Sequence, residues 1–259
     1  MLYRTNRSKH LFVAAVLLVS SFAAVAQNPQ RSPSDTVRDF YRLLRERKFK
    51  EAFGMSIYRP AIEGLSLQEF EELRPDFEKM ALAVVEKIPE KLSITGEQIS
   101  GDAATVFVHV LDADAKDKVE PASLIKVDNA WVVGDRENLE LVKKSGKQFF
   151  FEARINAHHN DVQDMMTRIS LAQVAYSQSH NGQFGNMLDL ITAGLVPKDI
   201  EGVESTGYRF QINKSPDGKG WSASAEPAQY GRSGRLSFAL DSSGIRSGDM
   251  GGKPLLPRN

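Results

Sequence analysis

The stretch DVQDMMTRISLAQVAYSQSHNGQFG, residues 161–185, decides how this chain is organised. Its apolar residues recur every three or four positions, the spacing of one buried face of an α-helix: Val162, Met165, Met166, Ile169, Ala172 and Tyr176. His180-Asn181-Gly182 then supplies a helix stop. We expect this helix to be the spine of a C-terminal domain over residues 161–246, which divides the chain in two.

Residues 1–26 have the pattern of an export signal. A basic start at residues 4–9 precedes the apolar run 11–26, and Ala24 and Ala26 form the small-x-small motif of a signal-peptidase site. The run is about 16 residues long, at or below the ~17–25 that span hydrocarbon. We therefore expect cleavage and a periplasmic or extracellular protein. An uncleaved anchor is the alternative.

Composition excludes several classes of function. No cysteine is present, which excludes disulfides, thiolate catalysis and cysteine-bound zinc or iron–sulfur sites. Three of the 33 basic residues lie in the export signal, which leaves 30 basic against 33 acidic residues. Because there is no basic excess, we expect no nucleic-acid partner. No later apolar run has the length of a membrane span, so we expect none after signal cleavage.

Residues 32–147 are predicted to form a first domain in which helices precede strands. Capping patterns at 32–35 and 66–69 begin two helices, and Pro75 is expected to split or kink the second. The apolar period then changes to two, which predicts four strands: 92–99, 103–111, 122–127 and 130–133. The last two strands form a hairpin around Asp128-Asn129, and residues 112–119 are a charged loop.

This order of elements resembles the nuclear-transport-factor-2-like superfamily, above all its small exported bacterial members. The likeness is carried by short motifs along the domain: Ser32-Pro33, Val37, Phe40-Tyr41, Phe49-Lys50-Glu51-Ala52, 101–106 and 124–131. The resemblance implies a cone, in which a curved sheet wraps over helices and leaves a pocket in its mouth. It implies that some members are isomerases or cyclases with an aspartate or histidine in the pocket, and that many only bind or dimerise.

Four residues are the candidate lining of such a pocket: Tyr41, Phe107, His109 and Trp131. His109 is the interior candidate for acid–base chemistry, but a general base needs an orienting partner and a perturbed pKa. Neither is indicated, so we expect a structural histidine, no catalytic residue and no enzymatic activity. Small-ligand binding, or isomerase- or cyclase-type activity in the pocket, is the alternative.

Three groups of side chains have the chemistry of metal ligands: Asp112 with Asp114 and Asp117, His158 with His159, and Asp241 with Asp249. The first group lacks the glycine of an EF-hand loop, and the third supplies too few oxygens for calcium. The adjacent histidines would point about 100° apart on a helix. We therefore expect a solvated loop, a surface or cap role and a tight turn respectively, with no metal and no cofactor.

The second domain follows a junction at 148–160. We expect Phe149-Phe150-Phe151 in this junction to pack into one domain or the seam between the two. After the spine helix, a short helix at 186–193 and three strands are predicted: 207–212, 220–225 and 236–240. A turn at 241–244 then leads into Ile245-Arg246, which leaves a fourth strand open. Residues 247–259 are expected to be a flexible tail.

One helix laid across such strands resembles the globular head of type IV pilins and type II secretion pseudopilins. The matching stretches follow one another in order: 169–182, 188–190, 193–195, 207–208 and 238–246. Pilins carry an apolar helix that runs directly into the head, whereas here a whole domain lies between the export signal and the head. The resemblance therefore implies the fold and leaves polymerisation open.

The fold class predicted from the sequence is α+β in two domains, each with its own core and with no tight cluster of ionisable groups drawn from both. We interpret the chain as a non-enzymatic envelope protein that binds or assembles with another envelope or secreted protein. A homodimer through the N-terminal domain is left open. A minor component of a pilus or secretion system is the remaining hypothesis.

Overall fold

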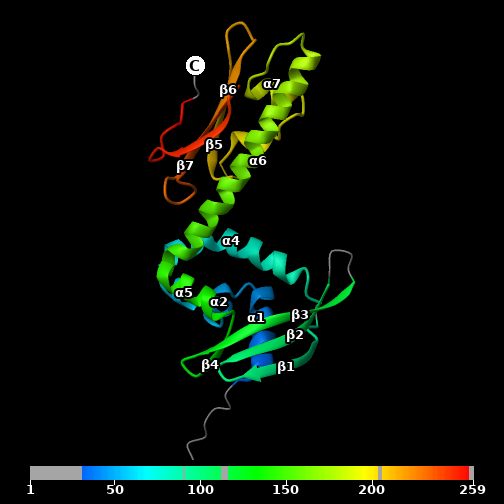
Figure 1. Ribbon diagram of the computed structural model, residues 1–259, viewed down its shortest axis with the longest axis vertical. Helices are drawn as coiled ribbons and strands as arrows, with labels where there is room; N and C mark the ends of the chain where they lie inside the picture. Colours follow the sequence, from blue (N-terminus) through cyan, green and yellow to red (C-terminus); the bar gives the residue numbers. More distant parts are fainter. Residues whose placement is uncertain (1–30, 90, 112–115, 204–205, 257–259) are drawn as a thin grey trace, which may run out of the picture. The chain divides into compact units, whose positions relative to one another are not determined.

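The computed structural model describes residues 31–89, 91–111, 116–203 and 206–256 and shows an α+β fold with two antiparallel sheets (Figure 1). Each sheet has four strands in chain order, β1-β2-β3-β4 and β5-β6-β7-β8. The export signal with Ala24 and Ala26, and Asp112 and Asp114, lie outside the described residues. None of the described helices combines the length and the hydropathy that crossing a membrane requires.

Four helices open the described chain: α1 Pro33–Arg45, α2 Phe49–Gly54, α3 Arg59–Glu63 and α4 Leu67–Val85. Both predicted caps are confirmed, because Ser32 accepts the amide of Asp35 and Ser66 forms a full capping box with Glu69. The predicted split at Pro75 is wrong. Helix α4 continues through this residue, whose missing N–H removes only one hydrogen bond from a 19-residue helix.

The first sheet consists of β1 Ile94–Ser100, β2 Ala103–Leu111, β3 Asp117–Val127 and β4 Ala130–Val133. Asp128 and Asn129 both have positive φ, as the predicted two-residue hairpin requires. The predicted loop 112–119 is corrected at its end. Strand β3 begins at Asp117, which pairs with Leu111, because the ladder to β2 extends beyond the apolar part of the strand.

The first sheet buries one face against helices. Val106, Val108 and Leu124 are at most 1% exposed and pack with Val37 of α1. A second cluster joins the helices to one another through aromatic rings, and Phe150 contributes to it with ring centroids 4.9 Å from Phe77. The expectation that the phenylalanine triplet packs into a domain is confirmed, and it packs into the first one.

The junction is helical. Helix α5 Arg136–Ser145 and a short 3₁₀ turn, η1 Gly146–Gln148, lead into α6 Phe149–Ser179, a helix of 31 residues. The spine helix thus begins twelve residues before the predicted position 161 and absorbs nearly all of the junction. The apolar triplet and the spine pattern lie on one continuous helix. The start of this helix is buried in the first core and its later turns are buried in the second core. Phe151 belongs to the first core and Val162 to the second.

The second sheet consists of β5 Tyr208–Lys214, β6 Trp221–Pro227, β7 Leu236–Asp241 and β8 Gly244–Asp249. Helix α6 lies along it with α7 Met187–Thr192 beside the helix, and η2 Lys198–Glu201 precedes the first strand (Figure 1). The core holds the expected face of the spine helix, with Met166 and Ile169 fully buried. The strand β8 runs three residues into the predicted tail, so the flexible segment does not begin at 247.

Ionisable side chains from both halves of the chain meet around the first turns of α6, which corrects the expectation of no shared cluster. The half-buried Arg154 of α6 donates to the carboxylates of Glu72 and Asp76 on α4, at 3.0 and 2.9 Å. Lys147 and Arg232, the latter from the β6–β7 loop at 228–235, approach Glu69 at 3.1 and 3.5 Å. We call this set of six side chains the ionic cluster. The two hydrophobic cores remain separate groups of residues.

Candidate functional site

The four predicted pocket residues do not lie on one face of the sheet. Tyr41 of α1 and Trp131 of β4 pack against the helix-facing core. Phe107 and His109 alternate along β2 with the buried Val106 and its neighbours, so their side chains stand on the opposite face. The structure therefore brings Tyr41 and Trp131 to the inner side and separates them from the other two.

The inner side of the first sheet is filled by its own side chains. Val106, Val108 and Val110 project there from β2, and Ile88 packs against them from the end of α4. Tyr41 is the titratable group beside this layer, and burial raises the pKa of its hydroxyl, with the charge of Glu120 adding to the effect. A tyrosine whose hydroxyl stays protonated in this way is not a base at neutral pH.

The predicted pair Asp241 and Asp249 holds turns and loops. Asp241 accepts the amide and the hydroxyl of Ser243, and Asp249 accepts the amide of Gly251 and the hydroxyl of Tyr230. Both carboxylates are thus engaged by the protein, as the tight-turn prediction expects. Within the described ranges, no group of three or more histidine, aspartate or glutamate side chains could hold a metal ion.

His158 and His159 are not a surface or cap pair, which corrects that prediction. Both are half-buried on α6 and bond to the β6–β7 loop. The Nδ1 atom of His158 lies 2.8 Å from the Ser233 carbonyl, and Nε2 of His159 accepts the amides of Arg235 and Leu236 at 3.2 and 3.3 Å. Both rings face the β6–β7 loop, whose backbone groups supply their hydrogen-bond partners.

The ionic cluster stabilises structure rather than exchanging protons. The amide of Ser66, together with the ammonium of Lys147, lowers the pKa of Glu69 to about 2. Glu72 and Asp76 both accept hydrogen bonds from Arg154. A carboxylate that stays ionised at neutral pH is a poor general acid, and one engaged by arginine is a poor nucleophile. The cluster therefore has the properties of an ionic clamp between α4 and α6.

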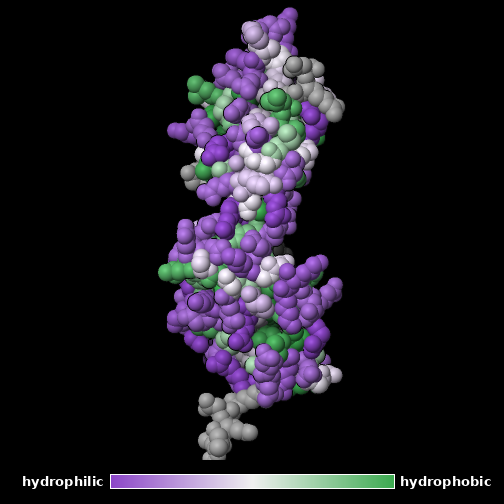
Figure 2. Space-filling view, turned by 90° about the vertical axis from the view of Figure 1, so that its left-hand side faces the viewer, coloured by the Kyte–Doolittle hydropathy of each residue, from purple (hydrophilic) through white to green (hydrophobic). Residues whose placement is uncertain are grey.

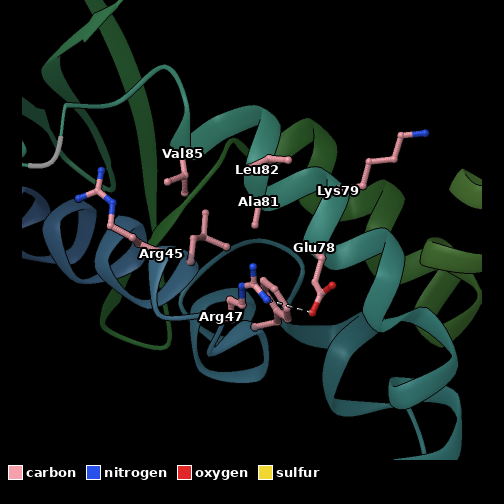
Figure 3. Close-up of a pocket in the computed structure, with 9 residues that line it drawn as sticks. Arg45, Arg47, Glu78, Lys79, Ala81, Leu82 and Val85 are labelled. Atoms are coloured by element: carbon pink, nitrogen blue, oxygen red, sulfur yellow. Dashed lines mark ion pairs between the residues drawn. The ribbon is translucent and has the colours of Figure 1, made fainter.

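A groove with an apolar floor lies between the end of α1 and the second half of α4, and we call it the α1–α4 groove (Figure 3). It has a volume of about 370 Å³. Its floor consists of Leu44, Phe49 and Ala81, all nearly inaccessible to solvent, with Val85 beside them. Leu82 stands on the α4 wall with 58% of its surface exposed.

Basic side chains edge this apolar floor. Arg45 and Arg47 come from the α1 side and Lys79 from α4, and Glu78 is the one carboxylate among the lining residues. Arg47 and Glu78 form an ion pair at 3.9 Å, drawn in Figure 3. This pair is long and solvent-exposed, so it costs little to rearrange.

A second hollow of about 350 Å³ continues the α1–α4 groove on the other side of Arg45. It is lined by residues of α1 and of the segment after α4: Arg38, Tyr41, Arg42, Arg45, Glu46, Ile88, Lys91 and Leu92. Together the two hollows are lined by six cations and two carboxylates. The guanidinium of Arg45 bonds the carbonyls of Ile88 and Pro89 and thereby fixes the end of α4 against α1.

The surface beside the α1–α4 groove is more apolar than the face of the molecule drawn in Figure 2. The visible face in Figure 2 is mainly hydrophilic, and hydrophobic side chains reach it in small, separate patches. On α4, by contrast, Met80, Leu82 and Val84 are all exposed by 37% or more within five residues. Of these three residues only Leu82 lines the groove, because Met80 and Val84 lie on the other side of the helix. An exposed leucine beside a concave, basic-edged apolar floor is typical of a binding surface.

Comparisons with known proteins add little. No family model matches the chain, and no curated protein matches it. Among solved structures it is similar to a protein from Campylobacter jejuni that is named as an NTF2-like transpeptidase. Identity is 18%, the match covers 40% of this chain and 99% of that chain, and the TM-score is 0.30.

The superfamily in that name is the one predicted for residues 32–147. A likeness at this level carries no argument about fold or activity, and it does not concern the pilin-like prediction for 161–246. Both resemblances therefore stay predictions, and the function has to be argued from the geometry.

Sequence reasoning missed the α1–α4 groove, although a signal for it was present. Residues 80–85, Met-Ala-Leu-Ala-Val-Val, are apolar on every side of the helix, whereas one buried face uses only about half of them. The surplus apolar residues indicate a second contact beyond the core. The basic wall comes from α1 and the turn after it, about 35 residues away, so its position beside this run could not be derived from spacing.

Proposed function

We propose that the protein is an exported, non-enzymatic binding module that docks a short segment of a partner protein in the α1–α4 groove. The observation that carries the proposal is the groove itself: an apolar floor beside the exposed Leu82 of α4, with basic side chains at its edge. Export is supported by the pattern of residues 1–26. The partner would be another envelope or secreted protein.

The chemistry of the groove specifies the segment that fits. Leu44, Phe49 and Ala81 offer a dry floor for two or three apolar anchors, which supply most of the affinity at such sites. The excess of cations favours acidic side chains flanking those anchors, since complementary charge gives specificity and a faster encounter. An amphipathic helix lying between α1 and α4 presents both features at once.

The test is affinity capture from the exported fraction of producing cells, with three forms of the mature protein as bait. Wild type is expected to retain a partner that contains an acidic amphipathic segment. Leu82→Glu buries a negative charge among carboxylates of the partner and is expected to cost about 2 kcal/mol or more, close to 30-fold in Kd. Raising the salt concentration should weaken capture, because the rim contacts are solvent-exposed.

Leu171→Glu is the matched control. Leu171 is a helical leucine with 67% exposure, on α6 rather than beside the groove, so the same substitution should leave capture unchanged. Equal loss in both variants, or a partner retained equally well by Leu82→Glu, would remove the groove from the proposal. A captured segment that is basic, or a partner-free monomer under all conditions, would refute the proposal itself.

A further inference from the structure

The β6–β7 loop, residues 228–235, is held to α6 by two adjacent histidines that play opposite hydrogen-bonding roles. His158 faces the carbonyl oxygen of Ser233 at 2.8 Å and must donate to it. His159 faces the amide N–H groups of Arg235 and Leu236 at 3.2 and 3.3 Å and must accept from them. Together the two rings hold the last residues of the loop and the first residue of β7.

The two roles respond differently to protonation. A histidine that donates from Nδ1 keeps that bond when the ring becomes an imidazolium, because both ring nitrogens then carry protons. A histidine that accepts at Nε2 loses its acceptor on protonation and instead directs an N–H at two other N–H groups. His158 can therefore hold Ser233 in either state, whereas His159 can hold Arg235 and Leu236 only when it is neutral.

The surroundings of His159 oppose its protonation. Its ring packs edge-on beside the rings of Tyr208 and Phe238, with centroids 6.3 and 6.0 Å away. Burial lowers the pKa of His159, and the nearby charges of His158 and Arg235 lower it further.

The other charged groups at this contact are already engaged by partners. Glu152 of α6 pairs with Arg235, at 2.8 Å between Oε2 and Nη1. Arg232 of the loop faces Glu69 of α4, and Asp249 of β8 accepts from Tyr230. The hydroxyl of Tyr208 donates to the Leu236 carbonyl.

Release of this contact would also affect the ionic cluster, because the same loop carries one of its six side chains. The loop carries Arg232, whose guanidinium stacks 4.1 Å from the ring centre of Phe151 and pairs with Glu69. Gly207 packs so closely on His158 that an added Cβ would lie 2.5 Å from its Nδ1, so this side of the contact has no free space. Movement is therefore expected at Arg235 and Leu236, with Ser233 as the fixed end.

We propose that His159 is an acid-sensitive latch, which holds the β6–β7 loop on α6 when neutral and releases Arg235 and Leu236 when protonated. The sign follows from linkage. A histidine whose pKa is lower in the folded state stabilises that state fully above its unfolded value of about 6.5, and the contribution is lost as the pH falls below that value towards the folded pKa. Acid therefore loosens the loop, and neutral pH closes it.

The test is amide hydrogen exchange of the full mature chain, measured from pH 7.5 to pH 4.5 and corrected for intrinsic exchange rates. The protection of the Arg235 and Leu236 amides is expected to fall below pH 6.5, by up to about tenfold per pH unit because one proton is coupled to opening. Core amides of β6 should keep their protection over the same range. An NMR titration of the His159 ring should give the same transition.

Two variants separate the latch from a merely structural contact. His159→Gln retains an acceptor that does not titrate, so both amides should stay protected at every pH, whereas His159→Phe should leave both unprotected even at pH 7.5. His158→Gln should preserve the pH dependence. An unchanged acid response in His159→Gln, or equal protection in wild type at pH 7.5 and pH 4.5, would overturn the proposal. Circular dichroism of each variant confirms that the loss is local.

Discussion

The two halves of α4 both lie beside cationic side chains, but only the first half offers carboxylates that pair closely with them. In the first half, Glu69, Glu72 and Asp76 meet cations from α6 and the β6–β7 loop at 3.5 Å or less. In the second half, Arg45, Arg47 and Lys79 line the groove together with Leu82, whose side chain is 58% exposed. The exposed side of α4 thus contacts other parts of the same chain along its first turns and faces solvent along its last turns.

The difference shows how a finished contact can be told from an open one. At the finished contact, each carboxylate has a hydrogen-bonded cation and Arg154 is only 11% exposed. At the open contact, the ion pair between Arg47 and Glu78 is 3.9 Å long and Leu82 is more than half exposed. Substitutions of the paired side chains in the first half of α4 should therefore destabilise the protein, whereas substitutions of the exposed side chains in the second half should affect only binding.

The largest effect is expected from the aromatic core that supports both halves. Phe150 is 3% exposed and touches Phe53, Phe77, Tyr58 and Phe149. Phe150→Ala leaves a cavity at the point where α6 meets the first core, and it should reduce the free energy of unfolding by about 3–5 kcal/mol. Urea denaturation followed by circular dichroism measures it. A loss below about 1 kcal/mol would show that the triplet does not belong to the core.

The ionic cluster should give the next largest effect. Arg154→Met keeps the length of the side chain but leaves Glu72 and Asp76 without their shared donor. Both carboxylates are about one-third exposed, so water recovers part of the loss and we expect about 1–3 kcal/mol of destabilisation. Lys143→Met, which removes an exposed pair with Glu140, is the control and should cost at most about 0.5 kcal/mol. If the two variants lose the same free energy of unfolding, the ionic cluster contributes no more to stability than an exposed ion pair does.

The same cluster predicts a dependence on acid. The pKa of Glu69 is about 2 in the folded protein, well below the value of about 4.3 of an unperturbed glutamate. A depressed pKa contributes stability that is present above the unfolded value and is lost as the pH falls towards 2. Glu69→Gln should be less stable than wild type at pH 6, and the gap should close between about pH 4.5 and 2. A gap that stays constant down to pH 2 would contradict this role.

The smallest effect on stability is expected in the α1–α4 groove. Leu82 and Lys79 are exposed, so Leu82→Ser and Lys79→Glu should each change the free energy of unfolding by no more than about 0.5 kcal/mol. The same two variants should weaken partner binding, which separates the groove from the clamp. Thermal denaturation measures the stability of each variant, and the capture assay measures its partner binding. A groove variant with a clearly lower melting temperature than wild type would show that these residues belong to the core.

Local patterns were sufficient for much of the fold. The caps at Ser32 and Ser66, the hairpin at Asp128-Asn129 and the buried face of the spine helix follow from neighbouring residues, and all are present. The α+β class with two antiparallel sheets follows from the change of period along the chain.

What could not be predicted depends on pairing between distant residues. The start of α6 at Phe149 was missed because the polar residues between the triplet and the spine pattern find partners in the β6–β7 loop and on α4. Tyr41 and His109 were assigned to one pocket because period two alone does not say which face of a strand meets the helices. Burial decides that, and it places His109 on the outer face.

Photo-cross-linking from position 82 tests the central claim most directly. A photoreactive phenylalanine analogue replaces Leu82 in the protein made by producing cells, and the same analogue at Leu171 is the control. We predict an adduct from position 82 alone, whose sequenced peptide carries apolar residues flanked by aspartate or glutamate. No adduct, an equal yield from both positions, or adducts only with lipid or basic peptides would contradict the claim that the second half of α4 is a docking surface.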